Sequence, residues 1–172
     1  SAYIDRDDEF MEDGIGRLLG DCVQKYDDLT GFAPGDVDGL LIMMNEPLDC
    51  CSYGGYGVFH YEDGTADLLR FGLIHAWGAK ASGHIAHEMG HGMGLPHANN
   101  SDEDDDPYDN PWDVMSMSSQ YGVRAEFGIR PKFLNAYHLD RLGWIAPERR
   151  LVVSEEGSTG SIELDSNGAP NG

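Results

Sequence analysis

Three histidines and a glutamate fall within the eleven-residue stretch HEMGHGMGLPH, which begins at His87. Residues four apart share one face of a helix, so His87 and His91 can direct two imidazoles at one point. Gly94 favours a turn that ends the helix, and this turn would bring His97 to the same point as a third nitrogen ligand. Three protein ligands with one open position are typical of catalytic zinc. The spacing therefore predicts a zinc site made of these three histidines.

Glu88 follows the first of these histidines, so it lies beside the predicted ligand face and not on it. A carboxylate in that place can reach the site from the side without binding the metal. Zinc lowers the pKa of its bound water to about 7, and a neighbouring carboxylate can take the released proton and pass it to the departing group. We therefore expect Glu88 to act as general base and then general acid in hydrolysis by a zinc-bound water.

Two glycines, Gly90 and Gly92, weaken the predicted active-site helix. Each costs a helix about 1 kcal/mol relative to alanine, whereas a bound structural zinc contributes roughly 10–16 kcal/mol of apparent free energy. The metal can therefore stabilise this helix, and the glycines also let other parts of the chain approach it closely. A metal-free, histidine-rich core helix is the alternative, and it explains neither Gly94 nor the third histidine.

His84 lies three residues before His87 and is a rival ligand by spacing alone. The role of third ligand fits His97 better, because the Gly94 turn otherwise has no explanation. We expect His84 to line the pocket.

The motif HExxHxxGxxH resembles the signature of the metzincin metalloproteases, which also carry a methionine turn further along the chain. Met115, in the segment PWDVMS, matches that methionine and would form an apolar floor beneath the metal. Some metzincins place a zinc-binding tyrosine two residues after it. Here that position is Met117, and Tyr121 is out of register. The sequences of PWDVMS and of residues 133–145 are most similar to those of the gametolysin-type branch of the metzincins.

The resemblance implies an α+β fold for residues 1–150, with a small twisted mixed sheet, the active-site helix above it, and a mostly irregular lower subdomain with one C-terminal helix. The upper part would reach to about residue 94, and the lower part would cover residues 95–150. Residues 151–172 would then be a linker or the start of a C-terminal β-rich region. The implied activity is zinc-dependent endopeptidase cleavage of a polypeptide bound in extended form along an edge strand.

Hydrophobic periodicity predicts the elements ahead of the site. Residues 5 to about 26 favour a helix, because apolar residues recur at steps of three and four. Residues 40–44 are a short continuous apolar run, which is typical of a strand buried on both faces. A loop is expected at residues 49–57, followed by strands at residues 57–61 and 68–76. Either of these strands could present an open edge to a peptide, or both could be paired internally.

The helices that follow have terminal signals. The active-site helix is expected to begin near residue 81 or 82, with Ser82 as its N-cap. A further helix is predicted over residues 131–142, with Pro131 at its first position and Gly143 as its terminator.

An acidic stretch follows the third histidine. Its carboxylates are hard oxygen ligands, and they suggest calcium binding at Asp102, Asp104, Asp106 and Asp109. The spacing matches no EF-hand, and a run of like charges is more often a solvated loop. The sequence leaves both interpretations open and favours the solvated loop.

The formal net charge is −20, from 31 acidic and 11 basic residues. Such a charge repels nucleic acid, and no basic stripe offsets it, so nucleic acid is excluded as a partner. Solubility or a saline habitat explains the charge better than attraction of cationic peptides. No apolar run is long enough for a membrane span. The length suits one domain, and we expect a monomer.

Three cysteines permit one disulfide. Cys22 could pair with Cys50 or with Cys51 and so tie the first helix to a later loop. Alternatively, Cys50 could pair with Cys51. A disulfide favours a secreted, extracellular protein. Two further functions stay open beside the protease: a zinc hydrolase acting on non-peptide bonds, and a catalytically silent binding or adhesion domain that zinc stabilises.

Overall fold

The computed structural model describes the following parts of the chain: residues 14–31, 36–46, 51–60, 64–100, 102, 104–117, 122–126, 128–152, 157 and 160–161. Its elements follow one another in the order α1 (Gly14–Thr30), β1 (Gly39–Met43), β2 (Tyr53–His60), β3 (Ala66–Ile74), η2 (Gly78–Lys80), α2 (Ser82–Gly92), β4 (Val123–Ala125), β5 (Gly128–Arg130), α3 (Ala136–Arg141) and η3 (Pro147–Arg149). The predicted α+β class, with a small mixed sheet and three helices, is therefore confirmed.

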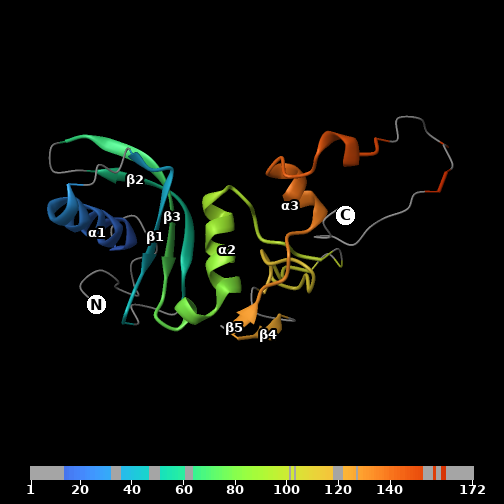
Figure 1. Cartoon of the computed structure of the whole chain (residues 1–172), viewed down its shortest axis with the longest axis horizontal. Coiled ribbons are helices and arrows are strands. Elements are labelled where there is room, and N and C mark those ends of the chain that lie inside the picture. Colours follow the sequence, from blue (N-terminus) through green and yellow to red (C-terminus); the bar gives the residue numbers. More distant parts are fainter. Residues whose placement is uncertain are drawn as a thin grey trace.

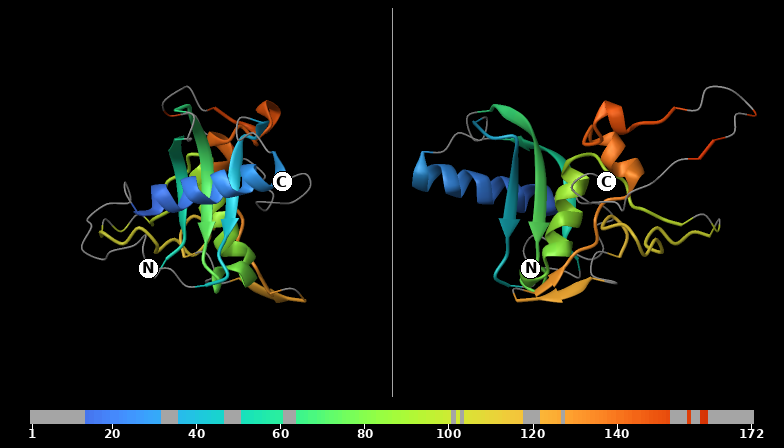
Figure 2. Two further views of the ribbon diagram at one scale, coloured as in Figure 1. Left: turned by 90° about the vertical axis from the view of Figure 1, so that its left-hand side faces the viewer. Right: turned by 45° about the vertical axis from the view of Figure 1, so that its right-hand side comes forward.

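The larger sheet has the strand order β1-β3-β2, with β1 parallel and β2 antiparallel to the central strand β3. Figure 1 shows this sheet between two helices, with α1 on one face and α2 on the other, and the second view in Figure 2 agrees. The second half of the chain lies on the far side of α2, where it carries the hairpin β4-β5 and α3. The helix α2 therefore lies between the sheet and the second half of the chain.

The helix α1 covers one face of the sheet with the apolar residues that the sequence pattern predicts. Its buried side chains pack with residues of β2 and β3 in one core cluster: Ile15, Leu18, Leu19, Val23, Phe59, Leu69, Phe71 and Leu73. The helix continues to Thr30, beyond the predicted end near residue 26, and Gly31 follows it with a φ of 66°. The predicted part ahead of Gly14 lies outside the described residues.

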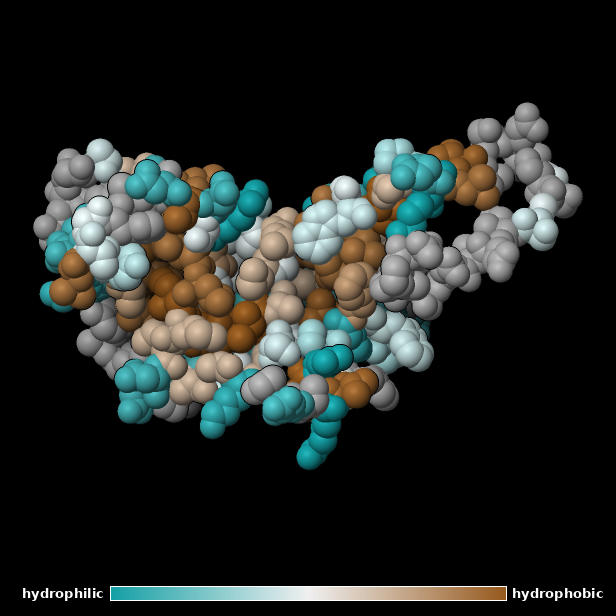
Figure 3. All heavy atoms as spheres, viewed as in Figure 1, coloured by the Kyte–Doolittle hydropathy of each residue, from teal (hydrophilic) through white to brown (hydrophobic). Residues whose placement is uncertain are grey.

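The strand β1 is less buried than its apolar sequence suggests, so the expectation of burial on both faces is wrong. It is an edge strand among the described residues, and its residues alternate between exposed and half-buried. Leu40 and Ile42 pack against the core cluster under α1, whereas Leu41 and Met43 point the other way and are 43% and 48% exposed. Apolar residues therefore form much of the surface over this part of the molecule (Figure 3).

The strand β2 begins at Tyr53, inside the segment that was expected to be a loop. The antiparallel ladder with β3 runs from the pair Tyr53–Leu73 to the pair His60–Ala66. The start of this strand was not predicted because residues 54, 55 and 57 are glycines, which add no side chains to the hydrophobic pattern that indicates a strand.

The helix α3 begins at Ala136 and not at Pro131, so the predicted start is wrong. Asn135 is its N-cap, because the Asn135 side-chain oxygen accepts a hydrogen bond from the backbone N–H of His138 at 2.9 Å. The residues before Asn135 run alongside the methionine turn, where the carbonyl of Phe133 accepts a hydrogen bond from the N–H of Val114. The predicted end is confirmed by Gly143, which has a φ of 71°.

Cys22 is a free thiol, and Cys51 is disulfide-bonded. A bridge from Cys22 that would tie the first helix to a later loop is therefore wrong. Burial, followed by the charge of Asp21, raises the pKa of the Cys22 thiol. Among the described helices, none has the length and apolar composition needed to cross a membrane. The division into residues 1–150 and 151–172 stays a prediction.

Candidate metal centre

The helix α2 carries the first two histidines and begins at Ser82, as the sequence predicts. Its N-cap is Ala81, without a side-chain cap, so the assignment of Ser82 as N-cap is wrong. The Ser82 hydroxyl instead donates a hydrogen bond to the carbonyl of Ile129 at 2.8 Å. This bond joins the start of α2 to β5, in the second half of the chain.

The C-terminal end of α2 has the turn that the sequence predicts at Gly94. Gly94 has a φ of 81°, a conformation that residues with a Cβ rarely adopt. Its N–H donates to the carbonyl of His91 at 2.9 Å, and the N–H of Leu95 donates to the carbonyl of Gly90 at 3.0 Å. This pair of bonds is a Schellman motif, which satisfies helix carbonyls and reverses the chain. The reversal brings His97 back to the helix.

The three predicted histidines meet at one point. The Nε2 atom of His91 lies 3.1 Å from Nε2 of His87 and 3.1 Å from Nε2 of His97. Nitrogens about 2.0–2.1 Å from one zinc with tetrahedral angles would lie about 3.3 Å apart. The three imidazoles can therefore hold a metal ion, and no other histidine, cysteine or carboxylate of the described residues joins their group of ligand atoms.

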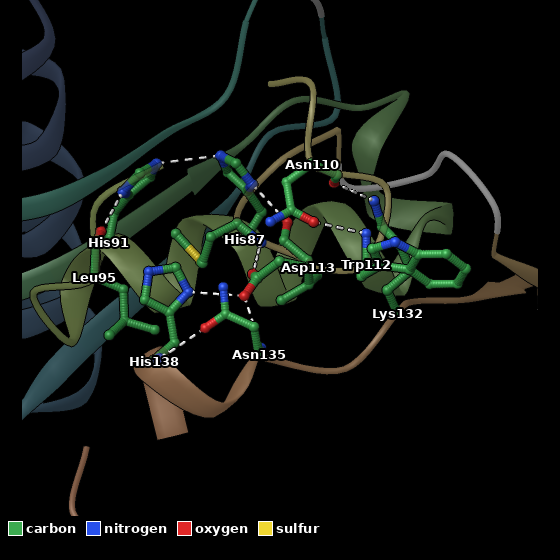
Figure 4. Close-up of polar contacts among 11 residues, drawn as sticks. His87, His91, Leu95, Asn110, Trp112, Asp113, Lys132, Asn135 and His138 are labelled. Carbon is green, nitrogen blue, oxygen red and sulfur yellow. Dashed lines mark hydrogen bonds and ion pairs between the residues drawn. The ribbon is translucent and has the colours of Figure 1, made fainter. Parts of the chain in front are cut away.

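Backbone carbonyls orient two of these rings. Nδ1 of His87 lies 2.8 Å from the carbonyl oxygen of Val114, and Nδ1 of His91 lies 2.9 Å from that of Leu95. A carbonyl only accepts, so each Nδ1 donates and each Nε2 keeps its lone pair for a metal. Figure 4 shows the two rings turned toward each other from α2. Among the described residues, Nδ1 of His97 has no such carbonyl.

Burial keeps the three imidazoles neutral. In the metal-free protein it lowers the pKa of His87 to about 4 and, to a smaller extent, lowers the pKa values of His91 and His97. A metal binds only to neutral imidazole, so at neutral pH the site competes with few protons for the ion.

Glu88 is buried next to the ligands. Desolvation raises the pKa of its carboxyl to about 7. Its neighbour on the helix is His84, whose Nε2 lies 4.0 Å from Oε1 of Glu88 and whose ring packs 4.5 Å from that of Trp77. His84 therefore lies beside the carboxylate and outside the ligand group, as expected, and its role in lining a pocket stays a prediction.

The edge strand β2 packs against α2 beside Glu88. A Cβ added at Gly54 would collide with the carbonyl of Glu88, so only glycine permits the strand to come this close to the helix. A Cβ added at Gly92, on the helix, would make only ordinary contacts, with the carbonyl of Gly55 3.7 Å away. Gly54 therefore lets the backbone of β2 lie on the helix that carries the carboxylate.

Met115 lies under α2, as the resemblance implies. It is fully buried, and its carbonyl accepts a hydrogen bond from the N–H of Ala98 at 3.0 Å. A Cβ added at Gly90 would collide with the Sδ atom of Met115, so the helix glycine makes room for the methionine. Met117, at the position of the tyrosine ligand of some metzincins, is 46% exposed. Tyr121 lies outside the described residues.

A buried carboxylate that the sequence analysis did not single out fixes this turn. Asp113 is fully buried, and its Oδ1 accepts a hydrogen bond from the N–H of Met115 at 2.6 Å. Its Oδ2 accepts from the N–H of Asn135 at 2.7 Å and lies 2.9 Å from Nδ1 of His138 (Figure 4). An aspartate before a turn is a sequence signal, but nothing in the sequence pairs it with a histidine 25 positions later.

Tyr108 is a second residue that the sequence analysis did not single out. Its ring centre lies 4.3 Å from that of His97 and 6.2 Å from that of His87. Burial, followed by the charges of Glu88 and Asp106, raises the pKa of its hydroxyl. Nothing in the sequence of the acidic stretch indicates that Tyr108 packs against the metal ligands.

The structure brings together three of the four aspartates of the calcium hypothesis. Carboxylate oxygens of Asp102, Asp104 and Asp109 lie within 4.8 Å of one another, and all three residues are at least partly exposed. Asp106 lies outside this group, and its Oδ1 accepts a hydrogen bond from the N–H of Tyr108. Oxygens of Asp102 and Asp104 likewise accept backbone N–H groups two residues further on, so these carboxylates build the loop.

Comparisons with known proteins found no relative of this chain. No family model matches the sequence, no curated protein matches it, and no solved structure matches it. The likeness to metzincins therefore depends on the motif residues themselves, and the function must be argued from the chemistry of the site.

Proposed function

We propose that this protein is a zinc-dependent endopeptidase of the metzincin type. His87, His91 and His97 would hold the ion, and Glu88 would transfer the proton. The observation that carries the proposal is the convergence of three neutral imidazole Nε2 atoms beside a buried carboxyl whose pKa is raised to about 7. A purely structural site has no use for that carboxyl, because structural zinc is closed by four ligands.

The role of Glu88 follows from its burial. A bound zinc would polarise the scissile carbonyl and lower the pKa of a water molecule. A carboxylate held beside that water can accept its proton and pass it to the departing amine, so one side chain acts as base and then as acid. Its position directly after His87 keeps it beside the ligands.

The edge strand β2 is the proposed binding surface for the polypeptide. The central strand β3 is paired on both sides, whereas β2 pairs only with β3 among the described strands. A peptide in extended form can add to its open edge through main-chain hydrogen bonds. Because Gly54 lies against the backbone of Glu88, such a peptide would run past the carboxyl that performs the chemistry.

We also propose that the protein is secreted. Cys51 is disulfide-bonded, and disulfides persist in oxidising compartments.

A pair of variants tests the protease assignment. Glu88→Gln keeps the size of the side chain and removes its proton transfer, so we expect one bound zinc and a loss of casein hydrolysis by about 10²–10⁴-fold. The matched control is Glu148→Gln, at an exposed glutamate of η3, which should leave hydrolysis unchanged. His97→Ala should lose zinc, as measured by metal analysis after dialysis.

Undiminished turnover by the Glu88→Gln variant would refute the role of this carboxyl. A zinc-loaded wild-type protein that cleaves small amides or esters but no polypeptide would refute the endopeptidase assignment in favour of another hydrolase. A protein that unfolds when zinc is chelated and cleaves nothing would instead be a zinc-stabilised binding domain.

A further inference from the structure

We propose that Tyr108 is a catalytic residue of this site, and that its hydroxyl donates a hydrogen bond to the oxygen of the scissile carbonyl as negative charge develops there. This inference rests on the proposed endopeptidase function and assigns a transition-state role to a residue outside the zinc-binding motif. Hydrogen-bond donors aimed at such an oxygen are among the largest contributors to catalysis of acyl transfer.

The geometry places Tyr108 at the rim of the metal centre. Its ring packs against His97 at 4.3 Å between centres, tilted by 50°, and lies 6.2 Å from the ring of His87. It is 38% exposed, so a substrate can reach it.

The loop holds Tyr108 in this position by hydrogen bonds on both sides. Its own N–H donates to Oδ1 of Asp106 at 2.8 Å, and Oδ1 of the next residue, Asp109, accepts from the N–H of Asn100. Short turns of this kind fix the direction of the side chain that follows. The acidic stretch therefore works as a scaffold that returns one aromatic residue to the histidines.

The ring and the hydroxyl have separable tasks. His87 and His91 are oriented by backbone carbonyls, whereas among the described residues His97 has ring contacts in place of such a carbonyl. The ring of Tyr108 packs on His97 and positions it. Removing the hydroxyl alone keeps the ring in place on His97, so it isolates the role of the hydroxyl in the reaction.

Two variants separate these tasks in the zinc-loaded protein. Tyr108→Phe keeps the ring, so zinc affinity and KM should not change, while kcat for a fluorogenic peptide that spans a mapped casein cleavage site should fall by about 10²–10³-fold. Tyr108→Leu removes the ring too and should also weaken zinc binding by about 10–100-fold. Tyr26→Phe, at a 55% exposed tyrosine of α1 on the far side of the sheet, is the matched control and should change nothing.

Equilibrium binding gives a readout besides turnover. A peptide phosphinate of the same sequence carries a tetrahedral oxyanion in place of the carbonyl, so Tyr108→Phe should weaken its Kd by the same factor as kcat/KM. Copper loading tests the alternative role, because a phenolate ligand gives an intense charge-transfer absorption with Cu²⁺. We expect no such band in the wild-type protein.

The outcomes are distinct. Wild-type kcat and unchanged phosphinate affinity in Tyr108→Phe would overturn the inference and leave the endopeptidase intact. A copper band that disappears in Tyr108→Phe would show that Tyr108 binds the metal, which also overturns the donor role. A wild-type protein that cleaves no polypeptide would overturn the proposed function, and this inference with it.

Discussion

Replacing Asp113 by asparagine should destabilise the second half of the molecule. The two side chains have nearly the same shape, so packing is preserved and only the acceptor chemistry changes. Asp113 is fully buried and its two oxygens face three donors, at 2.6 Å from the N–H of Met115, 2.7 Å from the N–H of Asn135 and 2.9 Å from Nδ1 of His138. An asparagine has one oxygen, and its amide nitrogen would face at least one of these donors.

The magnitude follows from the number of bonds lost. If the amide nitrogen faces Met115, one bond is lost. If it faces Asn135 and His138, two are lost. A hydrogen bond to a charged acceptor contributes about 1.5–3 kcal/mol, and a buried donor left without its partner costs about 1–3 kcal/mol. We expect a loss of about 3–5 kcal/mol, which is a large part of the roughly 5–15 kcal/mol that stabilises a typical domain.

Urea unfolding of the metal-free protein measures this loss as a shift of the midpoint at constant slope. Asp105→Asn, at an exposed aspartate, is the matched control and should change the free energy of unfolding by less than about 0.5 kcal/mol. Zinc affinity should fall too, because Val114, the residue after Asp113, supplies the carbonyl that orients His87. A loss below about 0.5 kcal/mol in Asp113→Asn would refute the assignment of this carboxylate as the anchor of the turn.

Two further perturbations test the packing and the charges of α2. Gly90→Ala would gain about 1 kcal/mol of helix propensity, but its Cβ would collide with the Sδ atom of Met115, so we expect the free energy of unfolding in urea to fall by about 1–2 kcal/mol. Gly92→Ala is the control, because its Cβ meets only ordinary contacts, and it should leave the free energy of unfolding unchanged or raise it. In the metal-free protein the raised pKa of Glu88 means that the folded state keeps a proton that the unfolded state releases between about pH 4.5 and 7, so stability falls through that window. The lowered pKa of His87 has the opposite effect between about pH 4 and 6.5. Metal-free Glu88→Gln should therefore gain stability with rising pH more steeply than the wild type, and equal slopes between about pH 4.5 and 6.5 would contradict the raised pKa of Glu88.

The convergence of the three histidines was predictable because it is local. His87 and His91 share a helix face by their spacing alone, and the positive φ of Gly94 is a property that the residue type itself indicates. Eleven consecutive residues therefore contain most of the information that builds the ligand set. The start of α2 followed from the same local pattern, although its cap did not.

The supporting residues could not be predicted because their partners are distant in sequence. Asp113 meets His138 across 25 positions, and Tyr108 returns to His97 through a loop shaped by its own carboxylates. Local patterns record neither pairing. The wrong helix start at Pro131 has the same origin, since hydrogen bonding beside the methionine turn holds the following residues extended.

Burial of β1 was mispredicted for a related reason. An apolar run predicts a strand, but its exposure depends on what covers the sheet, and the sequence of β1 says nothing of that. Leu41 and Met43 lie on the face opposite the α1 core and are 43% and 48% exposed.

The outline of the molecule dips above the C-terminal end of α2, between the sheet and α3 (Figure 3).

The hydrogen bond between His87 and the carbonyl of Val114 has a consequence for synthesis on the ribosome. The first imidazole is aimed by a residue made 27 positions later, and the residue before that one, Asp113, is itself bonded to His138. A nascent chain can thus display all three histidines and still lack an aligned centre. Ribosome-bound chains stalled before residue 113 should therefore take up zinc weakly, so metal loading would follow the order of translation.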